Sequence, residues 1–489
     1  MPLKPDHKTV MPHQAADERA HTFDEVNTGY TEARAQFEAS RCLQCQEAVC
    51  EGGCPVRVPI KAFLRCVAEG RFQEAFDVVK KANPLPAICG RVCPQETQCE
   101  KLCHMAARFE PVGIGHLERF VSDWERAHRL PATSLTGQAG LPRPTAPLRP
   151  VRPRVAIVGS GPSGLTAAGE LARLGYRVTI FEALHEPGGV LRYGIPEFRL
   201  PKAILDDEIA QLQASGVEIV CNVVIGKTVP LDQLLNTMGY HAVFIGTGAG
   251  LPRFLGIPGE NLNGVYSANE FLTRINLMKA YQFPESHTPL KVGSRVAVVG
   301  AGNTAMDAAR SALRMGAHEV RIVYRRSEAE MSARVEEYAH AKEEGIIFQW
   351  LTNPIRVVGN DDGWVAGLEC QPQRLGEPDE SGRARPIPTD DPPVLIPIDT
   401  MVIAIGTRPN RLLTKGGDLQ TTSWGGLIVN EDTGETSQPG VFAGGDAVTG
   451  AATVILAAGA GLRAASAIHA RLSAAPGESN GGESSHARG

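Results

Sequence analysis

RVAIVGSGPSGLTAA (154–168) and RVAVVGAGNTAMDAA (295–309) are two similar stretches that decide the fold of this 489-residue chain. Each combines a β-branched strand, a glycine-rich turn and the alanine-rich start of a helix. This order is typical of a parallel-sheet unit that binds a dinucleotide, because the glycines let the backbone approach a pyrophosphate at the helix N-terminus. Two copies predict an α/β protein with two Rossmann-like dinucleotide-binding domains.

The first stretch carries the glycine pattern G-x-G-x-x-G. The turn comprises Gly159, Gly161, Pro162, Ser163 and Gly164. The next strand, YRVTIFEA, carries Glu182 near its end, and a carboxylate there can accept hydrogen bonds from adenosine ribose hydroxyls. A tight turn in an unrelated α/β fold is the alternative. The acid after the second strand favours the dinucleotide site.

A third strand–turn–helix pattern, GVFAGGDAVTGAATVILAAGAG (440–461), lies near the end of the chain. Gly445 and Asp446 fall in its turn, where the carboxylate can bind a ribityl or pyrophosphate group, and Thr453 falls where the last helix opens. These patterns resemble the flavoprotein disulfide reductase superfamily, which has two dinucleotide sites. The resemblance implies that the first site holds FAD and that this late strand completes the FAD domain.

The second stretch predicts an NADPH site. Its turn, G-x-G-x-x-A, comprises Gly300, Gly302, Asn303 and Thr304, followed by the alanine. The next strand, EVRIVYRRS, carries Arg325 and Arg326 where the first copy has an acid. Guanidinium groups can bind a ribose 2′-phosphate that an acid would repel. The alternative is that these arginines are merely a solvated strand end.

Nine of the eleven cysteines lie between Cys42 and Cys103, and all of these except Cys66 fall into two groups of four. The first is C-x2-C-x4-C-x3-C-P, ending at Pro55, and the second is C-x3-C-P-x4-C-x3-C, starting at Cys89. In a reducing compartment such clusters indicate metal or redox chemistry rather than structural disulfides. The bacterial ferredoxin run is a similar string with a Cys-Pro end. Two four-thiolate zinc sites are the alternative.

The cysteines also suggest how electrons leave the flavin. A disulfide reductase would use a closely spaced dithiol beside the flavin, but Cys221 and Cys370 are far apart and have no such partner. The N-terminal cysteines are therefore the candidate exit, which favours iron–sulfur clusters over zinc.

Composition excludes several other classes of function. The net charge of −5 gives no electrostatic reason for nucleic acid or an anionic membrane as partner. The N-terminus, MPLKPDHKTVMPHQ, has no signal-peptide pattern, and no apolar run is long enough to span a bilayer. A cytoplasmic location is the expectation.

The whole pattern resembles one family over residues 20–470. It is similar to the small (β) subunit of NADPH-dependent glutamate synthase, to the N-terminal half of dihydropyrimidine dehydrogenase and to the large subunits of NADH-dependent ferredoxin:NADP oxidoreductases. The resemblance rests on RCLQC (41–45), the Cys-Pro groups, EPGGVLRYGIPEFRLPK (186–202) and YRRSEAEMSAR (324–334). It implies FAD contacts by Gly188, Gly189, Leu191 and Arg199.

By the same resemblance, the cysteines hold two [4Fe–4S] clusters. The first would take Cys42, Cys45, Cys50 and, by crossing over, Cys103. The second would take Cys54, Cys93 and Cys99. Its fourth ligand is either Glu118 or Cys89, and the resemblance favours Glu118.

The predicted organisation has six parts. A helical domain with two clusters (1–130) is followed by a proline-rich linker (131–153). The FAD-binding domain (154–290 and 401–472) surrounds an inserted NADPH-binding domain (291–400), and the tail (473–489) is expected to be disordered.

The resemblance implies an electron-input subunit of glutamate synthase. NADPH would reduce FAD by hydride transfer, with no catalytic side chain required, and electrons would pass through both clusters to a large FMN and [3Fe–4S] subunit that makes glutamate from glutamine and 2-oxoglutarate. One alternative is a ferredoxin:NADP or sulfide-type oxidoreductase subunit with the same electron path. Another is a zinc-stabilised assembly module with vestigial nucleotide sites.

Overall fold

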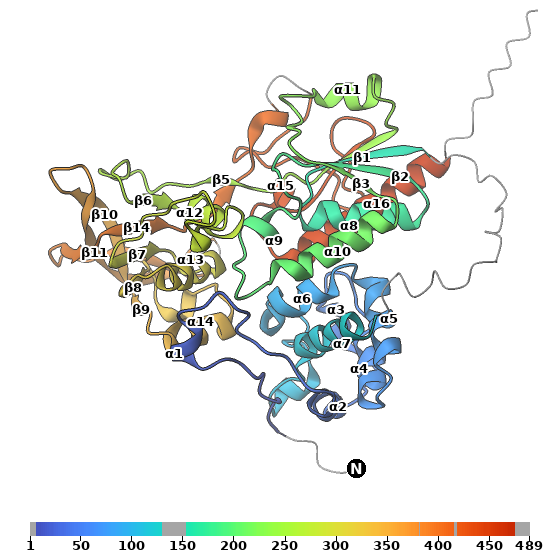
Figure 1. The fold of residues 1–489 in the computed structure, drawn as a ribbon, viewed down its shortest axis with the longest axis horizontal. Coiled ribbons are helices and arrows are strands. Elements are labelled where there is room, and N and C mark those ends of the chain that lie inside the picture. The colour runs from blue at the N-terminus through green and yellow to red at the C-terminus, as the bar shows by residue number, and fades with distance from the viewer. Residues whose placement is uncertain (1–5, 130–152, 381, 415–417, 475–489) are drawn as a thin grey trace, which may run out of the picture.

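The structure is a computed structural model that describes residues 6–129, 153–380, 382–414 and 418–474. It comprises an N-terminal helical domain and two α/β units, each built on a five-stranded sheet (Figure 1). The predicted linker (131–153) lies outside the described residues except for its last position, and the predicted tail does so except for residues 473 and 474.

The N-terminal domain consists of short helices around an apolar core of its own. Its core contains Phe63, Leu64, Val67, Val79 and Leu117, all fully buried. The helices are α1 (Ala16–Arg19), α2 (Glu32–Ser40), α3 (Val49–Gly52), α4 (Ile60–Ala68), α5 (Phe72–Ala82), α6 (Pro86–Val92) and α7 (Ile114–His128).

The first α/β unit has a parallel sheet in the order β16-β4-β1-β2-β3. Its strands are β1 (Arg154–Val158), β2 (Arg177–Phe181), β3 (Glu218–Val220), β4 (Ala242–Ile245) and β16 (Val441–Ala443). Its helices are α8 (Pro162–Arg173), α9 (Val190–Tyr193), α10 (Lys202–Ala214), α11 (Leu231–Asn236), α15 (Asp446–Thr449) and α16 (Val454–Ala474). Because β16 pairs with β4, the end of the chain completes the sheet that β1 starts.

The second α/β unit is inserted between β4 and β16, and its parallel sheet has the order β6-β14-β7-β8-β9. The strands are β6 (Val265–Ser267), β7 (Arg295–Val299), β8 (Glu319–Val323), β9 (Ile347–Gln349) and β14 (Thr400–Ile403), and the helices are α12 (Ala268–Asn276), α13 (Asn303–Arg314) and α14 (Val335–Glu343). The sheet takes strands from before residue 291 and after residue 400, so the unit extends on both sides of the expected interval. The three-residue strand β6 is too short for its period to reveal it in the sequence.

Two smaller antiparallel sheets complete the inserted unit and its connections to the first unit. An antiparallel sheet comprises β10 (Thr352–Gly359), β11 (Val365–Pro378), β12 (Ala384–Pro388) and β13 (Val394–Pro397), and a two-stranded pair joins β5 (Leu251–Pro252) to β15 (Thr407–Arg408). The two parallel sheets confirm the predicted pair of Rossmann-like domains after a helical domain.

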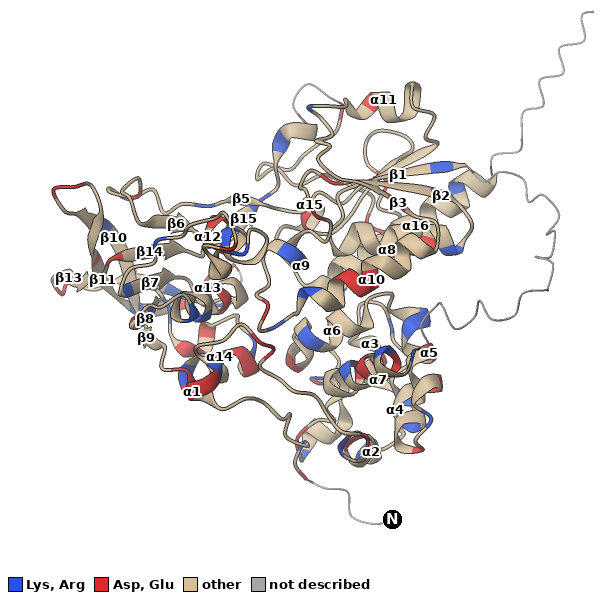
Figure 2. Ribbon diagram, viewed as in Figure 1, with Lys and Arg blue, Asp and Glu red and all other residues tan. Residues whose placement is uncertain are grey.

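The helical domain is packed directly onto the first α/β unit. Ile88, Cys89, Val92 and Cys93 of α6 and its C-terminal end belong to the same buried cluster as β1, α8 and α16. Acidic and basic residues are interspersed along the ribbon in Figure 2. None of the described helices is long and apolar enough to cross a membrane.

Candidate cofactor and electron-transfer sites

The first glycine turn leaves no room for side chains. Gly159 has a φ of +100°, and a Cβ there would lie 2.6 Å from the carbonyl oxygen of Gly246. A Cβ on Gly164 would lie 2.0 Å from the carbonyl oxygen of Gly159. These contacts hold β1 close to α8, whose first residue is Pro162. The turn therefore offers bare backbone at a helix N-terminus, as a pyrophosphate requires.

Glu182 is fixed at the end of β2 by the same turn. Its carboxylate accepts hydrogen bonds from the backbone N–H of Ser160 and of Leu184, each at 2.9 Å, and from the Ser160 hydroxyl. That hydroxyl in turn accepts from the N–H of Gly188 at 2.9 Å. Sequence reasoning missed Ser160, although a hydroxyl residue between the first two glycines was a signal for it.

The EPGGV stretch lies against the first turn, as the resemblance implied for a cofactor-binding segment. Gly189 has a φ of +54°, and a Cβ there would lie 2.7 Å from the Cα of Gly161. Leu191 is fully buried in the core, so its side chain packs against protein atoms. Its FAD contact stays a prediction.

Arg199 binds the second α/β unit. Its Nη1 donates to both carboxylate oxygens of Asp307, at 2.7 and 2.8 Å, and its Nε lies 3.0 Å from Glu337 Oε1. Asp307 follows the second glycine turn directly, on α13. The guanidinium thus joins the two dinucleotide-binding units, and a contact between Arg199 and FAD stays a prediction that these ion pairs do not support.

Asp446 stands at the last glycine turn, beside the first. Gly445 has a φ of +69°, and a Cβ there would lie 2.9 Å from the Ser163 hydroxyl. The Asp446 carboxylate accepts from the N–H of Ala452 at 3.2 Å, and its burial raises its pKa. A half-buried acid with one backbone donor fits a site where cofactor hydroxyl groups supply further hydrogen bonds.

Tyr193 is a further residue of this region that sequence reasoning missed. Burial, with smaller contributions from the nearby charges of Asp446 and Glu182, raises the pKa of its phenol to about 12. The phenol therefore stays neutral beside the first turn. The crowded glycines, the buried Glu182 and the half-buried Asp446 of this region fit FAD.

The second glycine turn repeats the geometry of the first. Gly300 has a φ of +130°, and a Cβ there would lie 2.3 Å from the carbonyl oxygen of Ala404. Gly302 precedes α13, and the Asn303 side-chain oxygen accepts from the N–H of Arg334 at 2.9 Å. Thr304 is exposed at the start of the helix. The turn fits a second dinucleotide.

The two candidate 2′-phosphate ligands differ in environment. Arg326 is buried, donates to the carbonyl oxygen of Ala384 at 2.8 Å and pairs with Asp379. Arg325 is exposed, and its side chain contacts no acid among the described residues. Arg325 is therefore the guanidinium that can reach a nucleotide without breaking an ion pair.

The four cysteines assigned to the first cluster line one cavity of the helical domain. Cys42, Cys45, Cys50 and Cys103 share it with apolar side chains, among them Ile60. Burial, together with the charges of Cys103 and Cys42, raises the pKa of Cys50 to about 12. Loss of water around the thiols is expected where a cluster fills the space. The structure thus brings together the four residues assigned to the first cluster, including the crossing Cys103.

The three cysteines assigned to the second cluster surround a buried carboxylate. Cys54, Cys93 and Cys99 interact electrostatically with Glu118 of α7, and burial raises the pKa of the Glu118 carboxyl to about 7. Asn83 lies between the two candidate fourth ligands. Its Nδ2 donates to Glu118 Oε1 at 2.7 Å, and its Oδ1 lies 3.7 Å from Cys89 Sγ.

These contacts fit a cluster and leave both Glu118 and Cys89 beside it. The four ligand atoms of tetrahedral zinc lie about 3.8 Å apart, given Zn–S distances of about 2.3 Å. In the described part of the chain, the group of His13, His340 and Glu343 is the only one whose ligand atoms all lie within 4.8 Å of one another. Within each cysteine group, the sulfur atoms are therefore spread farther apart than the ligand atoms of one tetrahedral zinc ion.

The residues next to Cys54 and Cys99 contact α16 of the first α/β unit. A Cβ on Gly459 of α16 would lie 3.3 Å from the carbonyl oxygen of Pro55, the residue after Cys54. The side chain of Gln98, next to Cys99, donates to the Thr453 hydroxyl at 3.4 Å. Thr453 is the residue before α16. The N-terminal part of α16, where the flavin is expected, therefore meets the neighbours of Cys54 and Cys99, two of the cysteines assigned to the second cluster.

Sequence comparisons agree with this division of the chain. The family described as dihydropyrimidine dehydrogenase domain II, 4Fe-4S cluster, matches residues 19–130, and the family described as pyridine nucleotide-disulphide oxidoreductase matches residues 153–461. The small chain of glutamate synthase [NADPH] of Escherichia coli is 36% identical over 456 residues, which cover 91% of this chain and 93% of that one. The chain belongs to the pyridine nucleotide-disulphide oxidoreductase family, in the branch that contains the glutamate synthase small chains.

Other members of the branch are longer. The β subunit of NADP(+)-dependent formate dehydrogenase of Moorella thermoacetica is 41% identical over 435 residues, and the chain spans 59% of its length. Among solved structures, Mycobacterium tuberculosis FprA in complex with NADPH is similar with a TM-score of 0.56 at 22% identity, over 66% of this chain and 85% of that one. This likeness confirms the fold of the two α/β units.

Proposed function

We propose that this chain is the electron-input subunit of a glutamate synthase, which takes electrons from NADPH and delivers them to a larger partner chain. The chain is an NADPH-dependent oxidoreductase, with FAD and [4Fe–4S] clusters as its other cofactors. When bound, these groups supply hydride acceptance from NADPH and one-electron transfer onward. The number of clusters, the partner and the residues that bind each cofactor are part of the proposal.

The single observation that carries the direction of electron flow is the contact of Pro55 with α16. It puts the group of Cys54, Cys93 and Cys99 next to the FAD unit. Cys42, Cys50 and Cys103 pack against the core of the helical domain and do not belong to the apolar cluster of the FAD unit. We therefore assign the second cluster as the first acceptor after the flavin and the first cluster as the exit to the partner.

The residues around the flavin site act by positioning. The helices α8 and α16 pack very closely because Gly461 of α16 has no side chain. A Cβ there would lie 2.4 Å from the carbonyl oxygen of Ser163. Ser160 orients Glu182 for the ribose hydroxyls. Hydride transfer needs close stacking and little acid–base catalysis, so a fixed scaffold suffices.

The proposal for the partner rests on the relatives. The glutamate synthase relatives are named small chains, and we propose a large FMN and [3Fe–4S] subunit as the acceptor for this chain. The formate dehydrogenase relative supports a second candidate, an electron-transfer subunit with the same internal path and a different acceptor.

Two measurements on anaerobically purified protein test the proposal. NADPH should bleach the flavin absorbance and then reduce the clusters, seen by electron paramagnetic resonance. A failure to bleach would overturn electron input. Affinity purification from native lysate should then recover a glutaminase-containing large chain. Recovery of a ferredoxin or a formate dehydrogenase catalytic chain would overturn the glutamate synthase assignment and favour the second candidate.

A further inference from the structure

Two histidines and a carboxylate meet outside the cofactor sites, between the N-terminal segment and α14. One ligand atom each of His13, His340 and Glu343 lies within 4.8 Å of the other two. His340 and Glu343 are three residues apart on α14 and therefore lie on the same face of the helix. His13 comes from the segment before α1. The group thus joins two parts of the chain that are more than three hundred residues apart.

His13 is held with one ring nitrogen directed to the protein. Its Nδ1 lies 3.1 Å from the backbone carbonyl oxygen of Met11 and donates to it when it carries the proton. In that tautomer Nε2 keeps its lone pair. A histidine that binds a metal almost always donates its other ring N–H to a carbonyl or carboxylate, as His13 does here.

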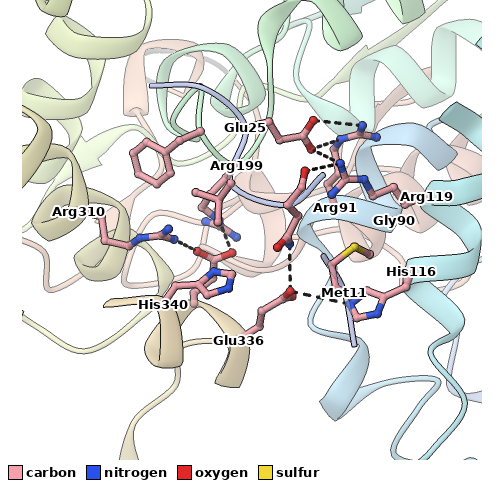
Figure 3. A pocket seen from close by; sticks show the side chains of 14 residues that line it. Met11, Glu25, Gly90, Arg91, His116, Arg119, Arg199, Arg310, Glu336 and His340 are labelled. Carbon is pink, nitrogen blue, oxygen red and sulfur yellow. Dashed lines mark hydrogen bonds and ion pairs between the residues drawn. The ribbon is translucent and has the colours of Figure 1, made fainter. Parts of the chain in front are cut away.

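His340 is a buried side chain without a hydrogen-bond partner for its ring. It is 5% exposed, and its imidazole makes no hydrogen bond with any described residue. The ring contacts that of His13, with centroids 5.3 Å apart, and it lines the cavity drawn in Figure 3. The ring nitrogens are not among the fully enclosed, unpaired polar atoms of the described residues, so the imidazole stays open to a ligand from the cavity that it lines. A bound ion would provide the missing partner.

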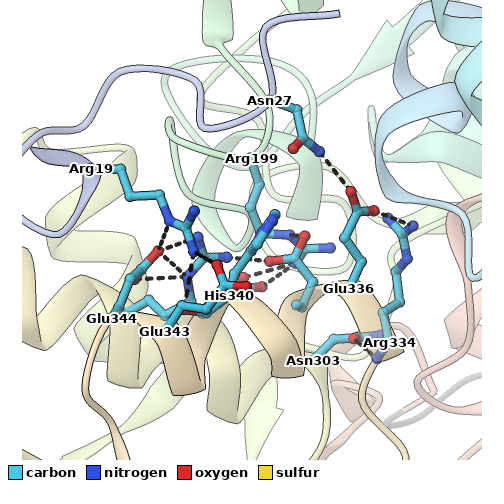
Figure 4. Close-up of polar contacts among 12 residues, drawn as sticks. Arg19, Asn27, Arg199, Asn303, Arg334, Glu336, His340, Glu343 and Glu344 are labelled. Carbon is cyan, nitrogen blue, oxygen red and sulfur yellow. Dashed lines mark hydrogen bonds and ion pairs between the residues drawn. The ribbon is translucent and has the colours of Figure 1, made fainter. Parts of the chain in front are cut away.

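Glu343 keeps one oxygen available. Its Oε2 pairs with Arg19, which also contacts Glu344 Oε1 at 3.0 Å (Figure 4). Arg19 further donates to the carbonyl oxygen of Gln14 at 3.0 Å. The charge of Arg19 is therefore compensated by two carboxylates. The remaining Oε1 of Glu343 can act as a ligand, and the pairing with Arg19 is the kind of outer contact that orients a ligating carboxylate.

We propose that His13, His340 and Glu343 bind one divalent ion of the zinc class, which ties the N-terminal segment to α14. Two imidazoles and a carboxylate suit zinc, and a water molecule would complete a tetrahedral set. The site lies apart from both cysteine groups and both glycine turns, so this inference does not depend on the proposed electron path.

Zinc binding to the holoprotein tests the proposal. Anaerobic protein with its flavin and clusters in place is treated with a mild chelator and titrated with Zn2+ by calorimetry. We expect one zinc per chain and an affinity at least about tenfold weaker in His13→Ala and in Glu343→Gln. His21→Ala is the matched control, since His21 is exposed just after α1 and lies outside the group, and this variant should bind zinc as the unmodified protein does.

X-ray absorption at the zinc edge identifies the ligands. Nitrogen and oxygen neighbours alone support the site, whereas sulfur neighbours would show zinc at the cysteines and overturn it. Unchanged affinity in His13→Ala, with unchanged flavin absorbance and circular dichroism, would also overturn it. Amide hydrogen exchange gives a second readout, because zinc should slow exchange in residues 10–19 of the unmodified protein and not in His13→Ala.

Discussion

Arg334 of the second α/β unit donates from its Nη1 to the backbone carbonyl oxygen of Arg91, at 2.8 Å, two residues before Cys93. Its Nη2 donates to Gln95 Oε1 at 2.9 Å, two residues after Cys93. The same residue bonds through its backbone N–H to Asn303, at the second glycine turn. One buried arginine therefore links the expected NADPH turn to the segment around Cys93.

Replacing Arg334 by alanine should loosen this junction. The carbonyl oxygen of Arg91 and the Gln95 amide would lose their buried donors, at a cost of about 2–4 kcal/mol in the free energy of unfolding. Thermal unfolding should begin at a lower temperature, and the dissociation constant for NADPH should rise. Arg253→Ala is the control, because Arg253 is exposed and makes no side-chain ion pair with the described residues. If both variants unfold at the same temperature and bind NADPH with the same dissociation constant, the role of Arg334 is contradicted.

Arg325 and Arg326 should respond differently to substitution. Arg325→Gln removes the exposed guanidinium that is expected to bind the 2′-phosphate. The ratio of kcat/KM for NADPH to kcat/KM for NADH should fall by about tenfold, which corresponds to about 1.4 kcal/mol. Arg326→Gln breaks the pair with Asp379 and should lower stability with a smaller change in preference. A preference unchanged in Arg325→Gln would refute its contact with the 2′-phosphate.

Glu118→Ala and Cys89→Ser should separate the two candidate fourth ligands. If Glu118 is the ligand, its loss should lower the iron content below about eight atoms per chain and alter one cluster signal, whereas Cys89→Ser should keep both. The reverse result would assign Cys89. Cys66→Ser is the control, because Cys66 is buried in the helical core outside both groups. Iron analysis and electron paramagnetic resonance give the readouts.

Adjacent glycines offer a matched test of how the two cysteine groups fold together. A Cβ on Gly53 would lie 2.8 Å from the carbonyl oxygen of Gln98, whereas a Cβ on Gly52 would meet nothing within 4 Å. Gly53→Ala should therefore push the segment of Cys54 away from Cys99, at a cost of about 1–3 kcal/mol, and reduce the iron bound. Gly52→Ala should keep the full iron content. Equal iron in both variants would contradict the close approach.

Much of the architecture could be predicted from local pattern. The β-branched runs at 154–158 and 295–299 form the central strands of their sheets, and each is followed by a glycine turn and a helix. Such signals are readable because strand and helix periods depend on neighbouring residues. The short strand β6 was not predicted, since three residues carry no period.

The candidate sites were predictable only in part. The cysteine spacing and the glycine turns pointed to cofactors, because those residue types serve few other purposes in that order. Ser160 and Tyr193 were missed. The pairing of Arg199 with Asp307 also gave no local signal, because it arises only where two domains meet.

The sequence by itself determined the two dinucleotide units and the family, because both follow from residues that lie close together in the chain. Only the tertiary structure decided which guanidiniums are taken up in ion pairs and which cysteines lie next to α16. Contacts such as Pro55 with Gly459 join residues about four hundred positions apart, and no local period encodes the packing of one domain on another.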